Sequence, residues 1–539
     1  MERLEADVLN VPEPPKTRVE QFVHDFMLTD PKIDRQRLVQ LKDDRVTGTC
    51  EWIKDHDRYQ SWLRGDQQLL WLTAGAGKGK TMLSIYLSEE LEKSEQHFST
   101  NNVLYYFCDH QDEKRNNAVA VMRGLLWQLT LIDDPKECLS KHLNAYIEMQ
   151  DKRQTSLFEL ESLWRLFAII MQDQDVGTTY CVLDAFNECD EESTRWLARK
   201  FFDFLASSAP DNINNALRLV LVSRVIPSLT MLTKCTPMEI DGGNDEQISA
   251  DVARMVSYNV EKLSRLPGFT EDFREEVQST LLERAEGTFL WAGHVMNELA
   301  REGTCSGVTQ RLHSLPKGLP AIYDRILLDI EQDRQEKASA ILRWATMAVA
   351  PLTLQELADA VQIKSAGTMD RLEIIRDEVR WFGSFLKIHD KADSLALQTV
   401  SLVHQSAREY LLRTEPEENG TLRSFRITPE KVHLDIAIAC LERIKNSHLQ
   451  RKALEPRDHA HWQDSPLLRY AVLNWTTHAR YSGGIGKELF SSPSFVLRRQ
   501  ESLGQNWWKT YVDSRPGEEW EQSKTLSPLH VACRFGIVE

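Results

Sequence analysis

The sequence predicts an α/β domain, with a mainly parallel sheet and helices on both faces, followed by a long region that is mainly helical. Between about residues 47 and 229, short apolar segments alternate with helical patterns, as in parallel sheets whose strands are joined by helices. After Pro227 the spacing of apolar residues becomes helical. The four expected strands are Leu69–Leu72, Val103–Phe107, Tyr180–Leu183 and Leu217–Val222.

Bulk properties limit the classes of function. With 539 residues the chain is too long for one hydrophobic core, so we expect roughly three or four domains. The formal net charge of −16 argues against a general nucleic-acid binder, which would carry a basic excess. Nine scattered cysteines without a Cys-x-x-Cys pair favour reduced thiols and a cytoplasmic location. No apolar stretch is long enough for a membrane span.

The glycine-rich octet Ala74–Thr81, between the first expected strand and the next helix, fits a phosphate-binding loop. Glycines let successive backbone N–H groups turn toward phosphate oxygens, and the helix N-terminus adds partial positive charge. We expect Lys80 to contact the β- and γ-phosphates and the Thr81 hydroxyl to hold Mg²⁺. An ordinary glycine-rich turn before a helix is the alternative. The candidate nucleotide-binding residues are Ala74, Gly75, Ala76, Gly77, Lys78, Gly79, Lys80, Thr81 and Met82.

The next two strands supply the other groups that such a site needs. Asp184 ends one strand and is expected to hold Mg²⁺, directly or through water. Glu188 is the candidate to polarise the attacking water, although both acids could simply belong to a strand end and an acidic turn. Arg224, at the tip of the following strand, could contact the γ-phosphate or be a surface cation. The predicted catalytic residues are therefore Lys80, Asp184, Glu188 and Arg224.

The region after the sheet favours helices and one small hairpin. Thr353 and Glu356 have capping-box spacing after Pro351. Two short strands, Trp381–Ile388 and Leu395–Val403, are expected on either side of a polar turn, which favours a winged-helix domain. In an acidic protein we expect such a domain to serve packing rather than DNA binding. One apolar helix face is expected to consist of Ile248, Val252, Met255, Val256, Val260 and Leu263. Aromatic anchors in the core or at an interface are expected at Trp462, Trp475, Trp507 and Trp508.

The last residues resemble the opening of an ankyrin repeat. The segment Leu526–Ala532 reads Leu-Ser-Pro-Leu-His-Val-Ala. One partial repeat cannot bury its apolar face, so we expect a chain truncated at the start of an ankyrin region, with a chance match as the alternative. The predicted domains are a helical lead-in (1–45), a nucleotide-binding domain (46–230), a helical domain (231–319), a winged-helix domain (320–415), a helical region (416–515) and an incomplete ankyrin repeat (516–539).

Taken together, these motifs resemble NACHT-type P-loop NTPases of the STAND class. More narrowly, the chain is similar to fungal NOD-like receptors, including heterokaryon-incompatibility proteins, whose P-loop domain is also called the nephrocystin-like N-terminal NACHT module. The resemblance covers about residues 20–415. Its specific stretches are Thr49–Ile53, the phosphate-binding loop with Thr81–Ser84 (Ala74–Ser84), Phe107–Asp109, Tyr180–Asp184, Ser223–Arg224, Glu286–Trp291, Leu315–Leu319, Tyr323–Leu327 and Val403–Ser406.

The resemblance implies a nucleotide switch with ATP or GTP and Mg²⁺ as cofactors. A closed ADP-like form and an open, self-oligomerising triphosphate form would signal in defence or heterokaryon incompatibility, with protein partners bound through the ankyrin region. It also implies that His404 contacts the diphosphate, although a buried histidine in a core hydrogen bond is an equal alternative. Gly287–Leu290 could line the base pocket, or Phe289 and Trp291 could pack in the core.

The chain departs from the family pattern in its acidic motif and in its domain organisation. Asn187 stands where the family usually has a second acid, and an amide can orient water or Mg²⁺ but cannot take a proton. We therefore expect slow hydrolysis with Glu188 acting alone, and regard the replacement of the usual glycine by Ala185 as minor. Only about 45 residues precede the NTPase core, so a separate effector domain is not expected. A steady-turnover NTPase motor and an inert NACHT–ankyrin scaffold are the alternatives.

Overall fold

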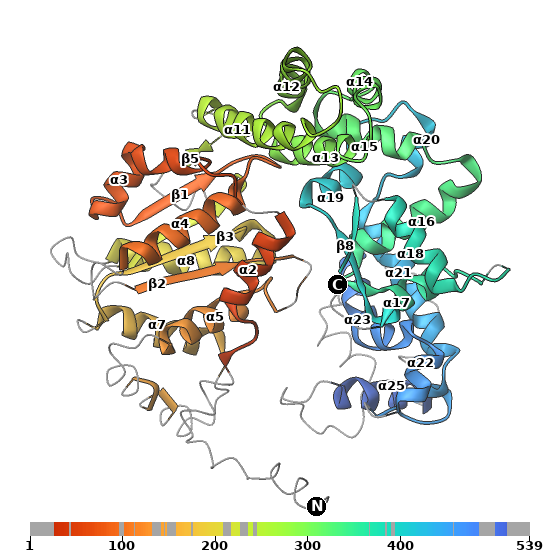
Figure 1. Cartoon of the computed structure of the whole chain (residues 1–539). Coiled ribbons are helices and arrows are strands. Elements are labelled where there is room, and N and C mark those ends of the chain that lie inside the picture. Colours follow the sequence, from red (N-terminus) through yellow and green to blue (C-terminus); the bar gives the residue numbers. More distant parts are fainter. Residues whose placement is uncertain are drawn as a thin grey trace, which may run out of the picture. The chain divides into compact units, whose positions relative to one another are not determined.

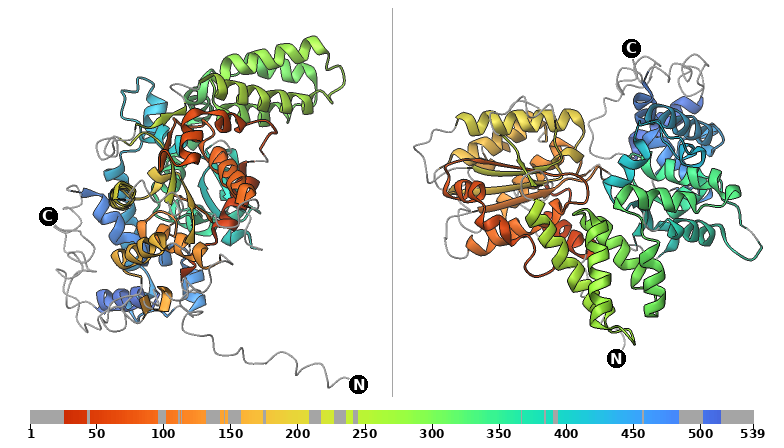
Figure 2. Two further views of the ribbon diagram at one scale, coloured as in Figure 1. Left: turned by 90° about the vertical axis from the view of Figure 1, so that its left-hand side faces the viewer. Right: turned by 90° about the horizontal axis from the view of Figure 1, so that it is seen from above.

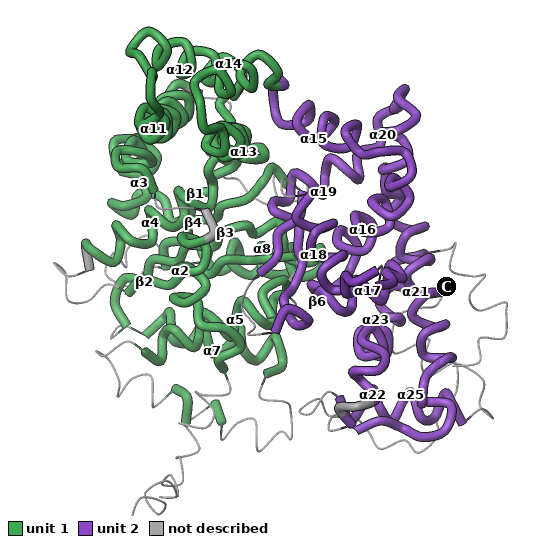
Figure 3. Tube along the Cα trace, turned by 45° about the vertical axis from the view of Figure 1, so that its right-hand side comes forward, with its two compact units in different colours: residues 1–315 green, residues 316–539 purple. Residues whose placement is uncertain are grey.

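The computed structural model of the chain consists of two compact units, residues 1–315 and 316–539 (Figure 3). The predicted ankyrin start at 526–532 lies outside the described residues. The structure describes residues 26–42, 45–95, 102–110, 112, 114–131, 142–144, 146–147, 158–173, 176–207, 217–226, 236–240, 245–365, 367–382, 385–389, 394–455, 458–483 and 502–514.

A five-stranded parallel sheet forms the centre of the first unit, in the order β2-β3-β4-β1-β5 (Figure 1). Four strands match the predicted segments to within one residue at each end: β1 (Leu69–Thr73), β2 (Asn102–Phe107), β3 (Thr179–Asp184) and β4 (Leu217–Ser223). The fifth, β5 (Met238–Glu239), was not predicted, because two residues are too few to show a strand pattern.

Helices cover both faces of this sheet, as the alternating pattern predicts (Figures 1 and 2). Trp62 packs edge-on against Tyr180 with ring centroids 5.5 Å apart, and the Arg35 guanidinium lies 4.3 Å from the centroid of the Tyr105 ring. Arg35 also donates to Ser88 on the neighbouring helix at 3.1 Å. These contacts place three helices on one face: α2 (Pro31–Lys42), α3 (Asp57–Arg64) and α4 (Lys80–Glu95).

The opposite face carries the large hydrophobic core of the unit. Trp71, Leu104 and Leu219 point from the strands into this core, and Trp164 meets Phe201 edge-on with ring centroids 5.1 Å apart. Burial of so much aromatic and branched surface is the main force that holds the helices on the sheet. The helices on this face whose bounds the structure describes are α5 (Ala118–Thr130), α7 (Leu160–Gln172) and α8 (Glu191–Ser207).

Within the described part of the first unit, the sheet is followed by the helices α11 (Asp245–Leu263), α12 (Glu271–Ala285), α13 (Phe289–Leu299) and α14 (Cys305–His313). The predicted apolar face of α11 is buried, apart from the partly exposed Met255. Asp251 on this helix accepts hydrogen bonds from the backbone N of Cys50, at 2.7 Å, and from the indole N of Trp52, at 3.2 Å. These bonds tie α11 to the short helix η1 (Glu51–Asp55) before the sheet.

The second unit contains the winged-helix elements that the sequence predicts. Its antiparallel sheet has the order β6-β8-β7, and the predicted capping box is present between Thr353 and Glu356. The hairpin strands are shorter than predicted, because α18 continues to Trp381 and Leu395–Leu397 form a 3₁₀ turn. The elements are α16 (Gln335–Met347), β6 (Leu352–Thr353), α17 (Leu354–Ala360), α18 (Arg371–Trp381), β7 (Leu386–His389) and β8 (Thr399–Leu402).

Other helices complete the second unit. Trp475 and Trp507 are buried with ring centroids 5.4 Å apart, which confirms them as core anchors, whereas Trp462 and Trp508 are partly exposed. No helix in the described ranges is both long and apolar enough to cross a membrane. The helices are α15 (Gly318–Leu328), α19 (Gln405–Leu412), α20 (Gly420–Ser424), α21 (Pro429–Lys445), α22 (His459–Asp464), α23 (Leu467–Tyr481) and α25 (Ser502–Asp513).

Candidate nucleotide-binding site

The predicted phosphate loop connects β1 to α4 at the carboxyl edge of the sheet. Gly77 and Gly79 have φ angles of +70° and +81°, a left-handed conformation that other residues rarely adopt. Helix α4 begins at Lys80, directly after the last glycine. The loop therefore has the strand, turn and helix N-terminus that an anion-binding site requires.

Lys80 folds back over its own loop. Its Nζ atom donates to the backbone carbonyl of Ala74 at 2.8 Å and also to that of Gly75. Neutral carbonyls are weaker partners for an ammonium group than anionic phosphate oxygens, because bonds between two charged groups are the stronger class. A phosphate group in the loop would therefore compete well for this ammonium group.

Asp184 ends β3 and is 2% exposed. Its Oδ1 atom accepts a hydrogen bond from the Ser84 hydroxyl of α4 at 2.7 Å. Thr81 lies one helical turn before Ser84, so both residues share one face of α4. A hydroxyl and a carboxylate are the oxygen ligands that Mg²⁺ prefers, and this donor set fits the ion at the predicted residues.

Glu188 is the last residue of η3 (Phe186–Glu188), which follows Ala185 in a left-handed conformation. Its Oε2 atom lies 3.4 Å from both the backbone N and the ring Nδ1 of His110. Possible ligand atoms of Asp109, His110 and Glu188 all lie within 4.8 Å of one another. The Asp109 carboxylate is also paired with Arg115 at 2.7 Å. The three residues therefore belong to a network of charged and polar groups.

His110 was missed by the sequence interpretation. It lies three residues after β2, and β2 pairs directly with β3, with Phe107 opposite Asp184. The rule that parallel strands end at one edge would have found it, had the order of the strands been known.

Asn187 has a structural task in this site. Its side-chain oxygen accepts a hydrogen bond from the backbone N of Arg224 at 2.9 Å and so links η3 to the tip of β4. Burial lowers the pKa of the Arg224 guanidinium, and the Glu188 carboxylate acts in the opposite direction. Arginine stays charged in proteins nonetheless. The structure thus brings Arg224, Asn187 and Glu188 together at one edge of the sheet.

The first residue of α13 and the residue before it pack against the phosphate loop. The backbone N of Phe289 donates to the carbonyl of Gly77 at 2.9 Å. A Cβ atom placed on Gly77 would lie 2.7 Å from the Thr288 methyl group, and one on Gly79 would lie 3.0 Å from the Phe289 ring. These two glycines therefore leave room for the helical segment as well as for the turn itself.

Further contacts bear on the two roles considered for Glu286–Trp291, which were lining of the base pocket and packing in the core. Lys78 donates to the backbone carbonyl of Glu286 at 3.0 Å. Trp291 is fully buried, as the core alternative expected, whereas Phe289 is partly exposed and covers the loop. A role of Gly287–Leu290 in a base pocket stays a prediction.

His404 belongs to the second unit, where it precedes α19 as its N-cap. Its Nδ1 atom accepts a hydrogen bond from the backbone N of Ser406 at 3.1 Å and lies 2.9 Å from the Ser406 hydroxyl. Capping of a helix is a sufficient structural reason for a polar side chain here. Contact of His404 with a diphosphate stays a prediction.

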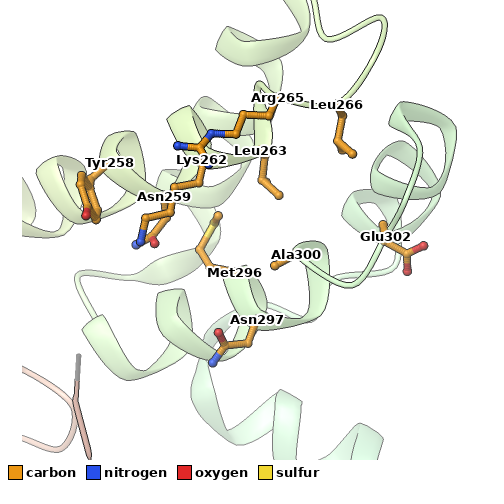
Figure 4. A pocket seen from close by; sticks show the side chains of 10 residues that line it. All are labelled: Tyr258, Asn259, Lys262, Leu263, Arg265, Leu266, Met296, Asn297, Ala300 and Glu302. Carbon is orange, nitrogen blue, oxygen red and sulfur yellow. The ribbon is translucent and has the colours of Figure 1, made fainter. Parts of the chain in front are cut away.

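The first unit also has a pocket of about 510 Å³ between α11 and α13 (Figure 4). Lys262 of α11 and Arg265, two residues after the end of that helix, give it two cations, and Met296 of α13 contributes apolar surface. Its lining includes no residue of the phosphate loop. The pocket is therefore separate from the residues that the sequence assigns to nucleotide binding.

Comparisons with known proteins agree with these observations. Residues 48–224 match the family model of the nephrocystin 3 N-terminal domain, and residues 326–423 match that of the GPI inositol-deacylase winged-helix domain. The chain is similar to vegetative incompatibility protein HET-E-1 of Podospora anserina, with 28% identity over 401 residues, which cover 73% of this chain and 28% of that protein.

A second curated relative is azaphilone pigments biosynthesis cluster protein L of Monascus ruber, with 27% identity over 175 residues, or 31% of this chain and 36% of that protein. The matched parts thus make up 28% and 36% of the lengths of these relatives. Their whole activities and partners therefore do not transfer directly to this chain.

Two solved structures align at low similarity. Drosophila ORC bound to DNA has 13% identity and a TM-score of 0.30, covering 75% of this chain and 93% of that one. The ADP form of the Aeropyrum pernix ORC2 protein has 9% identity and a TM-score of 0.29, covering 68% and 93%. At these scores the alignments add nothing to the fold described above.

The phosphate loop follows β1 within a parallel sheet, and Asp184 ends β3, which is separated from β1 by β4. The family model covers this same part of the chain, and the similarity to HET-E-1 extends over most of the sequence. A winged-helix domain follows. Residues 48–224 thus match a nephrocystin-like, NACHT-type P-loop domain, and the chain is similar to a fungal incompatibility protein.

Proposed function

We propose that this chain binds a nucleoside triphosphate, ATP or GTP, with Mg²⁺ and hydrolyses it slowly as part of a signalling switch. The observation that carries the proposal is the bond between Asp184 and Ser84. It holds a buried carboxylate against α4, the helix whose first two residues are Lys80 and Thr81. The lysine and the two oxygen groups to which we assign phosphate and Mg²⁺ binding thus lie on neighbouring elements, which supports the proposal.

Binding would use the loop before α4. Backbone N–H groups and the positive helix end favour the phosphates, and Lys80 would exchange its carbonyl partners for phosphate oxygens. Thr81 and Asp184 would hold Mg²⁺, which neutralises phosphate charge when bound. These groups recognise phosphates rather than the purine, so the proposal covers both nucleotides.

Hydrolysis would depend on Glu188 as the group that accepts a proton from water. The neighbouring Asn187 cannot share this task, because an amide does not take up a proton. Slow turnover suits a switch, since the lifetime of the bound triphosphate then sets the duration of the signal. Arg224 is positioned near Glu188 and is our candidate contact for the γ-phosphate.

The segment Glu286–Leu290 offers a route from nucleotide to conformational change. It contacts the phosphate loop through Lys78, Gly77 and Gly79, so a change in the loop alters the support of α13. A ligand that favours one loop conformation would shift the helices accordingly. We propose that this shift controls self-association and signalling in the cytoplasm, by analogy with the incompatibility protein to which the chain is similar.

The nucleotide content of the purified chain tests this proposal. We expect bound diphosphate and turnover well below about 1 s⁻¹, a rate at the low end for enzymes. Lys80→Ala should abolish triphosphate capture, whereas Lys93→Ala, on the exposed end of the same helix, should not. Unchanged affinity in Lys80→Ala would contradict the loop assignment. Turnover above that rate would favour a motor, and absence of nucleotide binding would favour an inert scaffold.

A further inference from the structure

The predicted water-activating carboxylate of Glu188 is contacted by His110, which lies three residues after the end of β2. Both the backbone N and the ring Nδ1 of His110 lie 3.4 Å from Glu188 Oε2. A ring that donates through Nδ1 carries its proton on that nitrogen. One oxygen of the Glu188 carboxylate therefore faces two donor positions of a single residue.

Neighbouring contacts fix the position of His110. Asn116 donates to its backbone carbonyl at 3.3 Å, and Arg115 pairs with the preceding Asp109 at 2.7 Å. The other ring nitrogen, Nε2, is buried and makes no hydrogen bond within the described part of the chain. Glu188 is thus the side chain to which the His110 ring is directed.

This arrangement opposes the role of Glu188 as a base. A general base needs a free lone pair aimed at the water whose proton it takes. Hydrogen bonds donated to a carboxylate favour its charged form and so make it a weaker base. The contact of Oε2 with His110 therefore reduces the capacity of Glu188 to accept a proton from water. The amide of Asn187 cannot accept that proton instead.

We infer that His110 is a positioning residue that restrains Glu188 and thereby prolongs the lifetime of the bound triphosphate. The inference rests on the proposed function, because it concerns the hydrolytic step of the same site. In that step the water oxygen bonds to the γ-phosphorus and its proton passes to Glu188. The bond from the γ-phosphorus to the bridging oxygen breaks, leaving a nucleoside diphosphate and inorganic phosphate. Release of Oε2 from His110 speeds the proton transfer.

Single-turnover hydrolysis of γ-labelled ATP and GTP, each bound with Mg²⁺, tests the inference. His110→Ala and the bulkier His110→Leu both remove the ring donor, and we expect each to hydrolyse roughly three- to tenfold faster, the factor that one net hydrogen bond is worth. Unfolding cannot produce such a gain. His110→Asn keeps an N–H donor and should fall between the parent and His110→Ala.

A matched control is available in the same unit. His142 forms another histidine–carboxylate pair, with its Nε2 atom 2.7 Å from Asp173 Oδ2, and belongs to none of the site elements. His142→Ala should therefore hydrolyse at the parental rate. The increase in His110→Ala should disappear when Glu188 is also changed to Gln, because the histidine acts through that carboxylate.

Hydrolysis that is unchanged or slower in both His110→Ala and His110→Leu, at parental triphosphate affinity, overturns the inference. Faster hydrolysis that persists in the Glu188→Gln background overturns it as well. Triphosphate binding is measured separately from hydrolysis. A parent chain that binds no triphosphate therefore identifies a failure of the proposed function itself, whereas a chain that binds and responds wrongly identifies a failure of the histidine restraint alone.

Discussion

The side-chain oxygen of Asn187 accepts a hydrogen bond from the backbone N of Arg224 at 2.9 Å. The bond joins the turn that carries Glu188 to the tip of β4. The family resemblance implies only that an amide stands here in place of the usual acid. In the structure, the same residue also determines where the Arg224 backbone lies beside the site.

Two substitutions separate these roles of Asn187. Asn187→Asp keeps an acceptor for the Arg224 N–H and adds a group that can take a proton, so single-turnover hydrolysis should rise about tenfold or more. Asn187→Leu removes the acceptor and should cost about 1 kcal/mol of stability without raising the rate. Equal rates in the parent and Asn187→Asp would show that this position does not limit hydrolysis.

Phe289→Ala tests the contact between α13 and the phosphate loop. The ring covers Gly79, and its loss should weaken loop packing by about 1 kcal/mol, equivalent to roughly fivefold faster nucleotide release. Stopped-flow release of a fluorescent nucleotide measures the effect. Phe273→Ala is the control, because the Phe273 ring packs against the Phe269 ring, with centroids 5.0 Å apart, rather than against the phosphate loop. Release at the parental rate in Phe289→Ala would remove this contact from the proposed switch.

The elements that carry the candidate nucleotide site were predictable because their signals are local. The strand, glycine loop and helix around Lys80 adjoin one another in the sequence. Asp184 and Arg224 follow apolar segments, and parallel strands end at one edge of a sheet. Predicted burial of the α11 face followed from helical periodicity in the same way.

Other features depend on tertiary neighbours and left no local signal. The contact of His110 with Glu188 requires β2 beside β3, and the contact of Phe289 with Gly77 requires α13 to return to the loop. The end of α18 at Trp381 illustrates a different difficulty, since apolar residues at a helix end also suit a strand. These contacts could therefore be identified only once the order of the strands and the packing of the helices were known.

Asp251→Ala should loosen the connection between α11 and the segment before the sheet. The buried carboxylate accepts from Cys50 and Trp52, and its loss leaves these donors unpaired at a cost of about 2 kcal/mol. Amide hydrogen exchange in η1 should then accelerate roughly thirtyfold, because the exchange rate follows the equilibrium constant for local opening, which this loss of free energy increases. Asp272→Ala, at the exposed start of α12, is the control. Unaltered exchange in Asp251→Ala would show that other contacts hold η1.

Paired histidines make the second unit sensitive to acid. His433 Nδ1 lies 2.8 Å from His478 Nδ1, and the Tyr470 hydroxyl lies 2.7 Å from His478 Nε2. Burial lowers the pKa of His433 to about 4, with Arg408 acting in the same direction and Glu430 opposing. Burial, together with the neighbouring His433, lowers the pKa of His478 to about 3.

The unfolded chain binds these protons near pH 6.5, whereas the folded unit excludes them down to the lowered pKa values. Stability is therefore complete above about pH 6.5 and falls as the pH drops toward 4, by about 1.4 kcal/mol per pH unit for each histidine. Thermal unfolding between pH 7 and 5, followed by circular dichroism, measures this slope. His433→Gln cannot titrate here and should reduce it by about half, whereas His461→Gln, at a partly exposed position, should retain it. A parental slope in His433→Gln would mean that other groups cause the acid sensitivity.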